Sequence, residues 1–439
     1  MHMDIGKLNG MVAEDAALRR RQVLQPVGGK GDKIFPPTYP PSDEAKRANR
    51  NAPPRHVYER RRLNGADIWC VLVDSVQSQA NRLEECLLAA VSDGIPIPYV
   101  EVDFTEAKLD GISKITSLDA PHRVYDAILR DSLYKDVPFM QSDVGQRLAK
   151  AKAADASVLL ETSPTALLFG AWHSTGQGGG LGAKFARCLI SEIVGIDVPV
   201  EDVVVNQRTG EVEVQTSGRR TGSRIDPLGI LNKVKIYQAK ADPSDWTAKE
   251  DEAATKGANK EPVLYPTKKG KPGRASLINH GNVIPSVQSL GVTCDHIEHG
   301  FVLSFAALRR LRFGGDKKDV AGRSLLAALG LVALAEQDAR GYALRSRCDL
   351  VCDGRASLEI VHSDGSIEAL AIDRTQARAL YDAAYHAAQG AGFSLSSKPL
   401  ELKPQDKLVE IVRKSQELAL AGKGSEEEEA GGDDAGSGN

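Results

Sequence analysis

The sequence predicts an α+β fold built around an antiparallel sheet. Segments typical of strands and of helices alternate along the 439 residues, and no repeat of fixed period occurs. Residues 200–215 and 356–372 each join two β-rich runs through a turn, the second of them at Asp364–Gly365. Hairpins of this kind pair antiparallel strands, whereas a parallel sheet would need a helix between each pair of strands.

Local patterns justify the elements in chain order. The apolar run at 66–75 predicts a buried strand, and leucines at helical spacing predict a helix from 76 that ends before Gly94. Alternation predicts a strand at 99–104. The further expectations are a helix at 142–157 capped by Ser142, a short strand at 157–162, a strand entering a helix within 291–313, a buried helix at 322–341, a strand within 347–354 and a helix from Thr375.

Composition suggests three parts. Residues 1–55 are expected to form a Pro/Gly-rich N-terminal arm, and residues 56–420 a core with insertions. Within that core, residues 238–276 lack periodicity, which predicts a flexible finger or thumb insertion. Residues 421–439 predict an acidic, disordered tail. The net charge of −3 becomes +3 when the six acids of the last sixteen residues are removed, so the expected core is mildly basic.

The composition and hydropathy of the sequence exclude several classes of protein. A hydrophobic content of 41% and a charged content of 26% are ordinary for a globular protein. No apolar run is long enough to cross a bilayer and no secretory leader opens the chain, so we expect a cytoplasmic protein without a membrane partner. Six scattered cysteines indicate reduced thiols, and Cys294, His296 and His299 lack a second ligand cluster nearby, so neither a metal nor a cofactor is expected.

Residues 174–182, the glycine-rich segment, contain five glycines and precede Lys184 and an expected helix. Glycine amides and a helix start are both suited to phosphate. A phosphate-binding loop of an NTPase is disfavoured, because Lys184 does not directly follow Gly182 and Phe185 replaces the Ser or Thr that would hold magnesium. A dinucleotide site lacks its acidic residue. The backbone of a nucleic acid is therefore the favoured ligand.

Cations recur in Gly- and Ser-rich contexts, which favours nucleic acid, although any one cluster could be a solvated surface. Trp172 and His173 offer flat faces to bases, the alternative being a hinge loop with Trp172 in the core. An aromatic content of 5% favours tracking of the backbone over reading of bases. The candidate RNA-binding residues from this reasoning are Trp172, His173, Ser174, Gln177, Gly178, Gly179, Gly180, Gly182, Lys184, Arg187, Arg219, Arg220, Arg224, Lys268, Lys269 and Arg274.

A series of motifs resembles a known family. The motifs, in order, are "RVYDAILRDS", "SDVGQRL", "LLETSPTALLFGAWHSTGQGGGLGAKFARCLISEIVGID", "GSRIDPL", "HGNVIPS" and "VLSFAALRRLRF". Over roughly residues 55–400 the chain resembles the backbone subunit of the type I-G (formerly I-U) CRISPR Cascade complex, a member of the RAMP superfamily. The resemblance implies an RRM-like (ferredoxin-like) antiparallel sheet core with large insertions that form a thumb and fingers.

The resemblance also implies a function in antiviral defence. Copies of such a subunit stack head-to-tail along the CRISPR guide RNA and present it for pairing with target DNA. The other expected partners are a large subunit, a guide-processing subunit and a recruited helicase-nuclease that cuts the DNA. The subunit itself is expected to be no enzyme and to need no cofactor.

Residues 75–85 are similar to the Ser/Gln-rich strand-to-helix junction that contacts guide RNA in other RAMP backbone proteins. Gln79, Asn81 and Arg82 are therefore further candidates for RNA binding, the alternative being a solvated first helical turn. A competing function is a metal-dependent ribonuclease of a RAMP-type complex that cuts target RNA through a loop aspartate, for which Asp226 or Asp316 would serve. A nucleotide-dependent enzyme is the third reading.

Overall fold

The structure is a computed structural model, and it describes residues 3–41, 43, 47, 54–173, 183–205, 212–231, 233–257, 259–265 and 273–420. These residues divide into two compact units. The first unit comprises residues 1–217 and 291–410, and the second comprises residues 218–290 and 411–439.

The main sheet of the first unit has the strand order of a ferredoxin-like fold. Its six defining elements follow one another as β–α–β–β–α–β. They are β1 (Ala17–Pro26), α3 (Val76–Ser92), β10 (Leu189–Ile196), β19 (His296–Ser304), α9 (Asp316–Arg340) and β21 (Cys348–Cys352). In the sheet these strands lie in the order β21–β1–β19–β10, and all neighbours are antiparallel. The predicted α+β class and RRM-like core are thereby confirmed.

Five more strands widen this sheet. The hairpin of β2 (Tyr58–Leu63) and β3 (Ala66–Asp74) adds to the edge at β10. At the opposite edge β20 (Tyr342–Arg345) pairs with β21, and the predicted hairpin of β22 (Leu358–Val361) and β23 (Ile367–Leu370) pairs with β1.

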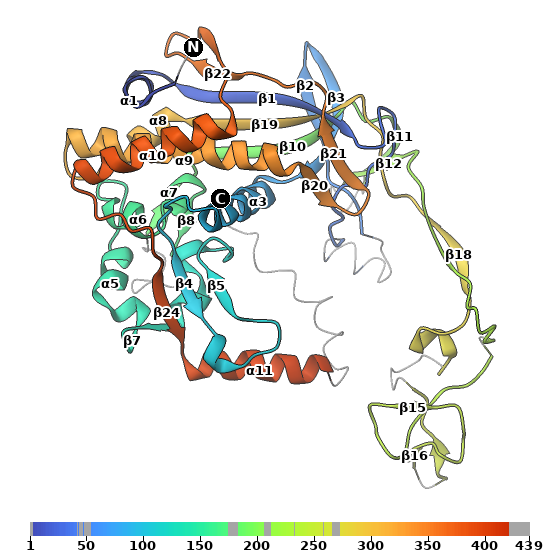
Figure 1. Cartoon of the computed structure of the whole chain (residues 1–439). Coiled ribbons are helices and arrows are strands. Elements are labelled where there is room, and N and C mark those ends of the chain that lie inside the picture. The colour runs from blue at the N-terminus through green and yellow to red at the C-terminus, as the bar shows by residue number, and fades with distance from the viewer. Residues whose placement is uncertain are drawn as a thin grey trace. The chain divides into compact units, whose positions relative to one another are not determined.

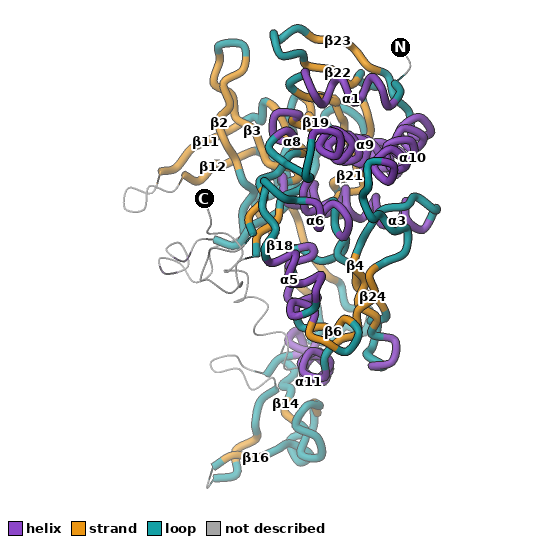
Figure 2. Tube along the Cα trace, turned by 90° about the vertical axis from the view of Figure 1, so that its left-hand side faces the viewer, coloured by secondary structure: helices purple, strands orange, loops and turns teal. Residues whose placement is uncertain are grey.

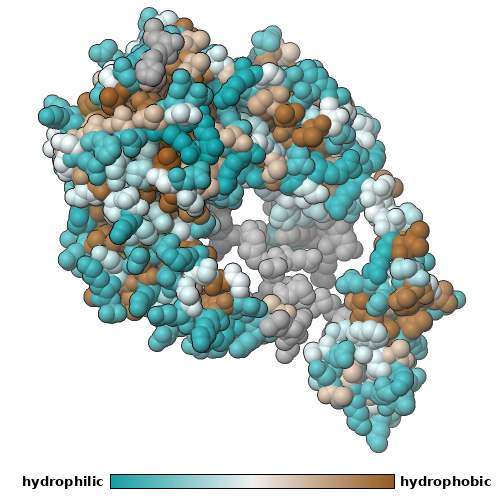
Figure 3. All heavy atoms as spheres, viewed as in Figure 1, coloured by the Kyte–Doolittle hydropathy of each residue, from teal (hydrophilic) through white to brown (hydrophobic). Residues whose placement is uncertain are grey.

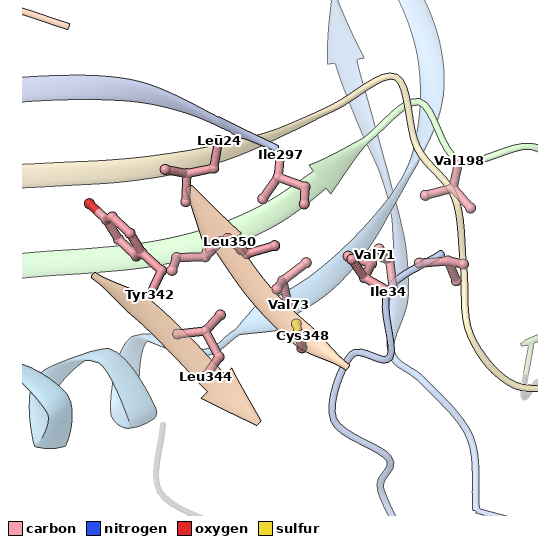
Figure 4. Close-up of a cluster of buried hydrophobic side chains, with 12 residues drawn as sticks. Leu24, Ile34, Val71, Val73, Val198, Ile297, Tyr342, Leu344, Cys348 and Leu350 are labelled. Carbon is pink, nitrogen blue, oxygen red and sulfur yellow. The ribbon is translucent and has the colours of Figure 1, made fainter. Parts of the chain in front are cut away.

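Helices pack together against one face of the sheet. α9 contacts α3, α1 (Ile5–Glu14) and α10 (Arg374–Gly390), and Figure 1 shows α9 and α10 running side by side below β1 and β19. α8 (Phe305–Arg309) is the short helix that directly follows β19. The sheet and helices enclose buried apolar side chains, each of which stabilises the fold by roughly 1.5–3 kcal/mol. One cluster at the end of the sheet, shown in Figure 4, includes Leu24, Val71, Val73, Ile297, Tyr342 and Leu350.

The predicted N-terminal arm is wrong for residues 5–26. Asp4 caps α1 by accepting a 2.8 Å hydrogen bond from the Lys7 amide, and β1 lies in the middle of the sheet. The sequence pattern does not reveal β1 as a buried strand, because two of its buried positions are polar, Arg20 and Gln22. Both find partners inside the fold, since Arg20 binds Asp338 and the Gln22 amide donates to the Gly354 carbonyl at 2.6 Å.

A first insertion, residues 93–188, separates α3 from β10. It carries a second sheet of order β5–β4–β24–β6–β7, in which the C-terminal β24 pairs in parallel with β4. Figure 2 shows β4 and β24 side by side. Its strands are β4 (Val100–Asp103), β5 (Lys114–Thr116), β6 (Ser132–Tyr134), β7 (Val137–Pro138) and β24 (Leu400–Pro404). Its helices are η1 (Thr105–Ala107), η2 (Arg123–Tyr125), α4 (Ala127–Arg130), η3 (Phe139–Gln141), α5 (Asp143–Ala149), α6 (Ser157–Thr162) and α7 (Thr165–Leu168), and α11 (Asp406–Leu420) follows β24.

Two expectations for this insertion need correction. The predicted strand at 157–162 is the helix α6, because periodicity alone does not distinguish a short buried helix from a buried strand. The predicted helix at 142–157 ends at Ala149, although Ser142 does cap it and accepts a 3.1 Å hydrogen bond from the Gly145 amide.

A second insertion, residues 197–295, separates the neighbouring strands β10 and β19. It begins with the predicted hairpin of β11 (Val200–Val205) and β12 (Val212–Thr216). The second compact unit follows, built on a ribbon of β13 (Arg220–Arg224) and β18 (Val283–Gln288). Its small elements are β14 (Tyr237–Gln238), β15 (Trp246–Thr247), β16 (Thr255–Lys256), β17 (Glu261–Pro262) and η4 (Ala275–Ile278).

The predicted insertion 238–276 lies inside this second unit, which is larger than expected. Apolar residues gather on its surface in Figure 3, and Ile225, Leu228 and Leu231 are among its exposed side chains. The predicted acidic tail, residues 421–439, lies outside the described residues. Along the described chain, no helix has the length and apolar character needed to span a membrane.

A buried polar network links the sheet to α9. The Ser191 hydroxyl lies 2.7 Å from His299 Nε2, and His299 Nδ1 lies 3.1 Å from the Tyr342 hydroxyl. That hydroxyl donates to Asp338 Oδ1 at 2.9 Å, and Arg20 binds the same carboxylate. Burial, followed by the charge of Arg20, lowers the pKa of His299 to about 3, so the imidazole is neutral near pH 7.

The buried histidine predicts acid-sensitive stability. Below its ordinary pKa of 6.5, His299 takes up a proton in the unfolded chain but not in the native protein. The free energy of unfolding should therefore fall, through this residue, by about 1.4 kcal/mol per pH unit down to about pH 3. Urea unfolding at several pH values should show a steeper loss for the natural protein than for His299→Gln. Equal pH slopes for the two proteins would contradict this.

Candidate functional site

A short two-stranded ladder is formed by the residues that flank the glycine-rich segment in the sequence. β8 (Ala171–Trp172) pairs with β9 (Lys184–Phe185), and the His173 amide donates to the Ala183 carbonyl at 2.8 Å. The expected helix after the segment is therefore wrong: Lys184 lies in a strand and Arg187 in the link to β10. The chain continues into β10 because β3 and β19 both pair with it, and this tertiary pairing overrides local helix propensity.

Trp172 and Lys184 form an exposed cross-strand pair in this ladder. Trp172 is 45% exposed, and the Lys184 ammonium lies 5.6 Å from the centre of its ring. A cation over an indole face is favourable, by about 0.5–1 kcal/mol at an exposed site. The pair presents an aromatic face and a positive charge side by side, which suits a base and its phosphate.

Arg187 adds a second exposed cation beside the ladder. Partial desolvation, followed by the charge of Arg123, lowers its pKa. Among the described residues, neither Arg187 nor Lys184 forms an ion pair with an acidic side chain. Cations without an acidic partner can bind an external anion such as a phosphate.

Gly170 allows the link before β10 to pass close to the start of the ladder. Its φ of +82° is a conformation that glycine adopts without strain. A Cβ at this position would lie 3.0 Å from the Phe185 carbonyl oxygen and 3.1 Å from Arg187 Cγ. Any larger residue would therefore push the stem of Arg187 away from the ladder.

His173 faces the interior instead of the surface. Its ring stacks on Tyr125 at 5.0 Å with an angle of 10°, and the side chain is buried. Burial lowers the pKa of His173, so the ring is a neutral packing partner. The structure thus brings Trp172, Lys184 and Arg187 together on the surface and leaves the His173 ring inside.

Several predicted site residues lie outside the described residues. They are Ser174, Gln177, Gly178, Gly179, Gly180 and Gly182 of the glycine-rich segment, together with Lys268 and Lys269 of the second unit.

Residues 18–200 match the family model described as CRISPR-associated protein GSU0053. The similarity to that family thus extends over these residues. The matched region includes β1, α3 and the whole ladder with its glycine-rich segment.

The comparison with solved structures found a distant similarity. The crystal structure of Thermofilum pendens Csc2 aligns at 10% sequence identity over 96% of this chain and 81% of that chain, with a TM-score of 0.27. That score is too low to support an argument from the similarity. No curated protein matches the chain.

The strand-to-helix junction directs two of its three predicted RNA contacts inward. Gln79 is fully buried and donates to Asp74 at 2.6 Å. Arg82 donates to the same carboxylate at 2.9 Å and to the Leu344 carbonyl at 2.7 Å. Asn81 is exposed. Gln79 and Arg82 therefore organise the core at this junction, which the spacing of polar residues did not reveal.

The outer face of the sheet is another surface to test, because RRM proteins stack bases on aromatics of the two central strands. No Phe, Tyr or Trp occurs in β1, and Phe301 of β19 is buried. The outward cations of β1 are already paired, Arg19 with Glu359 at 2.7 Å and Arg21 with Glu298 at 2.8 Å. The ladder, and not this face, is the better candidate for an RNA contact.

The remaining predicted cations belong to the second unit. Arg220 and Arg274 are exposed, the first in β13 and the second just before η4. Arg219 donates to the Gly218 carbonyl at 2.9 Å, and Arg224 donates to the Asn279 carbonyl.

The two aspartates that could serve a ribonuclease, Asp226 and Asp316, lie in different environments. Asp226 is buried, and its oxygens accept hydrogen bonds from the Gly281 amide at 2.5 Å and the Leu228 amide at 3.1 Å, which lower its pKa. Asp316 begins α9, fully exposed, 3.7 Å from Arg312. In the part of the chain that the structure describes, no group of three or more His, Cys, Asp or Glu side chains could hold a metal ion.

Proposed function

We propose that this chain is the backbone subunit of a type I Cascade complex, of the I-G subtype, and that it multimerises along the CRISPR guide RNA. The supporting observation is the exposed group of Trp172, Lys184 and Arg187 beside a glycine-rich segment, within residues that match a CRISPR-associated family. The ordered series of motifs supports the subtype. The role is that of a binding module without catalysis, in the cytoplasm.

The group can bind RNA without reading its sequence. Lys184 and Arg187 would neutralise phosphates, and Trp172 would stack on a base, a contact that every base can make. A chain of such subunits would present the guide to target DNA. The other partners proposed are the large subunit, the guide-processing subunit and the recruited helicase-nuclease.

Assembly on RNA tests this function. A subunit that repeats head-to-tail makes a heterologous contact, which need not close into a ring. We expect the mass of the assembled complex to rise stepwise with the length of the guide RNA, measured by light scattering after co-expression. Protein expressed without guide provides the control. A closed oligomer of one size on guides of different length would contradict the proposal.

A further inference from the structure

Arg123 forms a buried connection between α3 and the ladder. Its guanidinium makes two 2.8 Å hydrogen bonds to the carboxylate of Glu84, a residue of α3. A further N–H donates to the Gly170 carbonyl at 3.1 Å, and the guanidinium lies 5.4 Å from the centre of the Phe169 ring. Both Arg123 and Glu84 are buried, at 7% and 1% exposure.

The backbone at Arg123 is unusual as well. Its φ of +55° lies in the left-handed region, which residues with a side chain seldom adopt. Such a conformation persists where the surroundings determine it, and it is concentrated at functional sites. Here the conformation accompanies a guanidinium with three fixed acceptors, an arrangement that only the planar fork of arginine can satisfy.

The connection continues from Gly170 to the exposed cations. Gly170 packs against the stem and amide of Arg187, and it directly precedes β8, whose Trp172 pairs with Lys184. The Arg123 charge also acts on Arg187, whose pKa it helps to lower. A shift of the Gly170 carbonyl would therefore move the cation stem and the ladder together.

We infer that Arg123, held by Glu84, is a positioning residue that sets the Gly170 turn and thereby aligns Arg187 and the Trp172–Lys184 pair for RNA phosphates. This inference rests on the proposed function of the ladder. Arg123 itself is buried and does not touch the ligand. The two hydrogen bonds to Glu84 fix the guanidinium of Arg123. The third hydrogen bond, to the Gly170 carbonyl, then holds the residue that directly precedes the ladder.

The test compares Arg123→Lys with a matched control, Arg323→Lys. Arg323 is also buried and binds a carbonyl, that of Leu311, at 3.0 and 2.8 Å, together with the Asp319 carboxylate at 3.3 Å. Both variants keep the charge and lose the fork. The probe is a fluorescein-labelled single-stranded RNA of unrelated sequence, titrated over a range of salt concentrations against the folded full-length protein.

We expect Arg123→Lys to weaken binding about ten-fold and to flatten its salt dependence, because phosphate contacts are lost. Arg323→Lys should lower the melting temperature without changing the salt slope. In an Arg187→Ala background, Arg123→Lys should add little, since both changes act on the same contact. Independent, multiplying effects, or unchanged binding by folded Arg123→Lys protein, would overturn the inference. If Arg187→Ala itself left binding unchanged, the ladder as RNA site would fail instead.

Discussion

Reversing the two exposed cations beside the glycine-rich segment, Lys184→Glu with Arg187→Glu, should abolish stable capture of guide RNA and leave the fold intact. Neither side chain forms an ion pair with an acid in the described part of the chain, so the change should lower the free energy of unfolding by no more than about 1 kcal/mol, mainly through the lost cation–π contact of Lys184 with Trp172. Binding should weaken at least about 100-fold, because two attractive phosphate contacts become repulsive. In a multimer the loss recurs in every subunit.

The measurements are paired: the melting temperature of the free protein, and the guide retained after a salt wash. Lys152→Glu with Lys398→Glu is the matched control, since both lysines are exposed and have no acidic partner among the residues that the structure places. The control should retain guide RNA. Lost RNA with unchanged melting would support the ladder as the binding site. A lowered melting temperature with RNA binding kept in the folded fraction would remove it from consideration.

Removing the carboxylate of Asp74 should destabilise the protein more than any surface change. Asp74 has no exposed area and accepts hydrogen bonds from four side chains: Ser78 at 2.8 Å, Gln79 at 2.6 Å, Arg82 at 2.9 Å and Arg345 at 3.0 Å. Asp74→Ala would leave these donors without their acceptor. Breaking a buried ion pair costs about 3–5 kcal/mol, and we expect about 3 because both arginines are a quarter exposed.

Chemical denaturation would measure that loss. Asp382→Ala provides the comparison, because Asp382 is exposed and pairs only weakly, at 3.6 Å, with His386. We expect the control to stay within about 0.5 kcal/mol of the natural protein. Should Asp74→Ala prove as stable as the control, Gln79 and Arg82 would be free for RNA, as the sequence alone suggested.

Gln79 and Arg82 show why the sequence alone gave a wrong prediction of RNA contacts at the strand-to-helix junction. A helix start with Gln79 and Arg82 has the residue types of an RNA contact, and their spacing is the same whether they point to solvent or to the core. Asp74 decides between these states, because a fully buried carboxylate needs donors and the first turns of α3 supply them. Such a requirement arises only when the strand and the helix are placed together.

The sequence by itself determined the α+β class and most elements with a strong pattern. The apolar period of α3, the apolar run of α9 and the turn at Asp364–Gly365 are local properties, and each element appears in the structure, although α9 begins at Asp316 instead of 322. The ordered motifs likewise indicated the CRISPR-associated family that residues 18–200 match.

Only the tertiary structure decided where β1 lies and which predicted site residues meet. A strand with arginine and glutamine on its buried face cannot be recognised until Asp338 and Gly354 are beside it. Likewise, Lys184 reaches Trp172 only because β8 and β9 pair. The physical reason is the same in both cases: burial of a polar group is favourable only with its partner, and these partners are far apart in the chain.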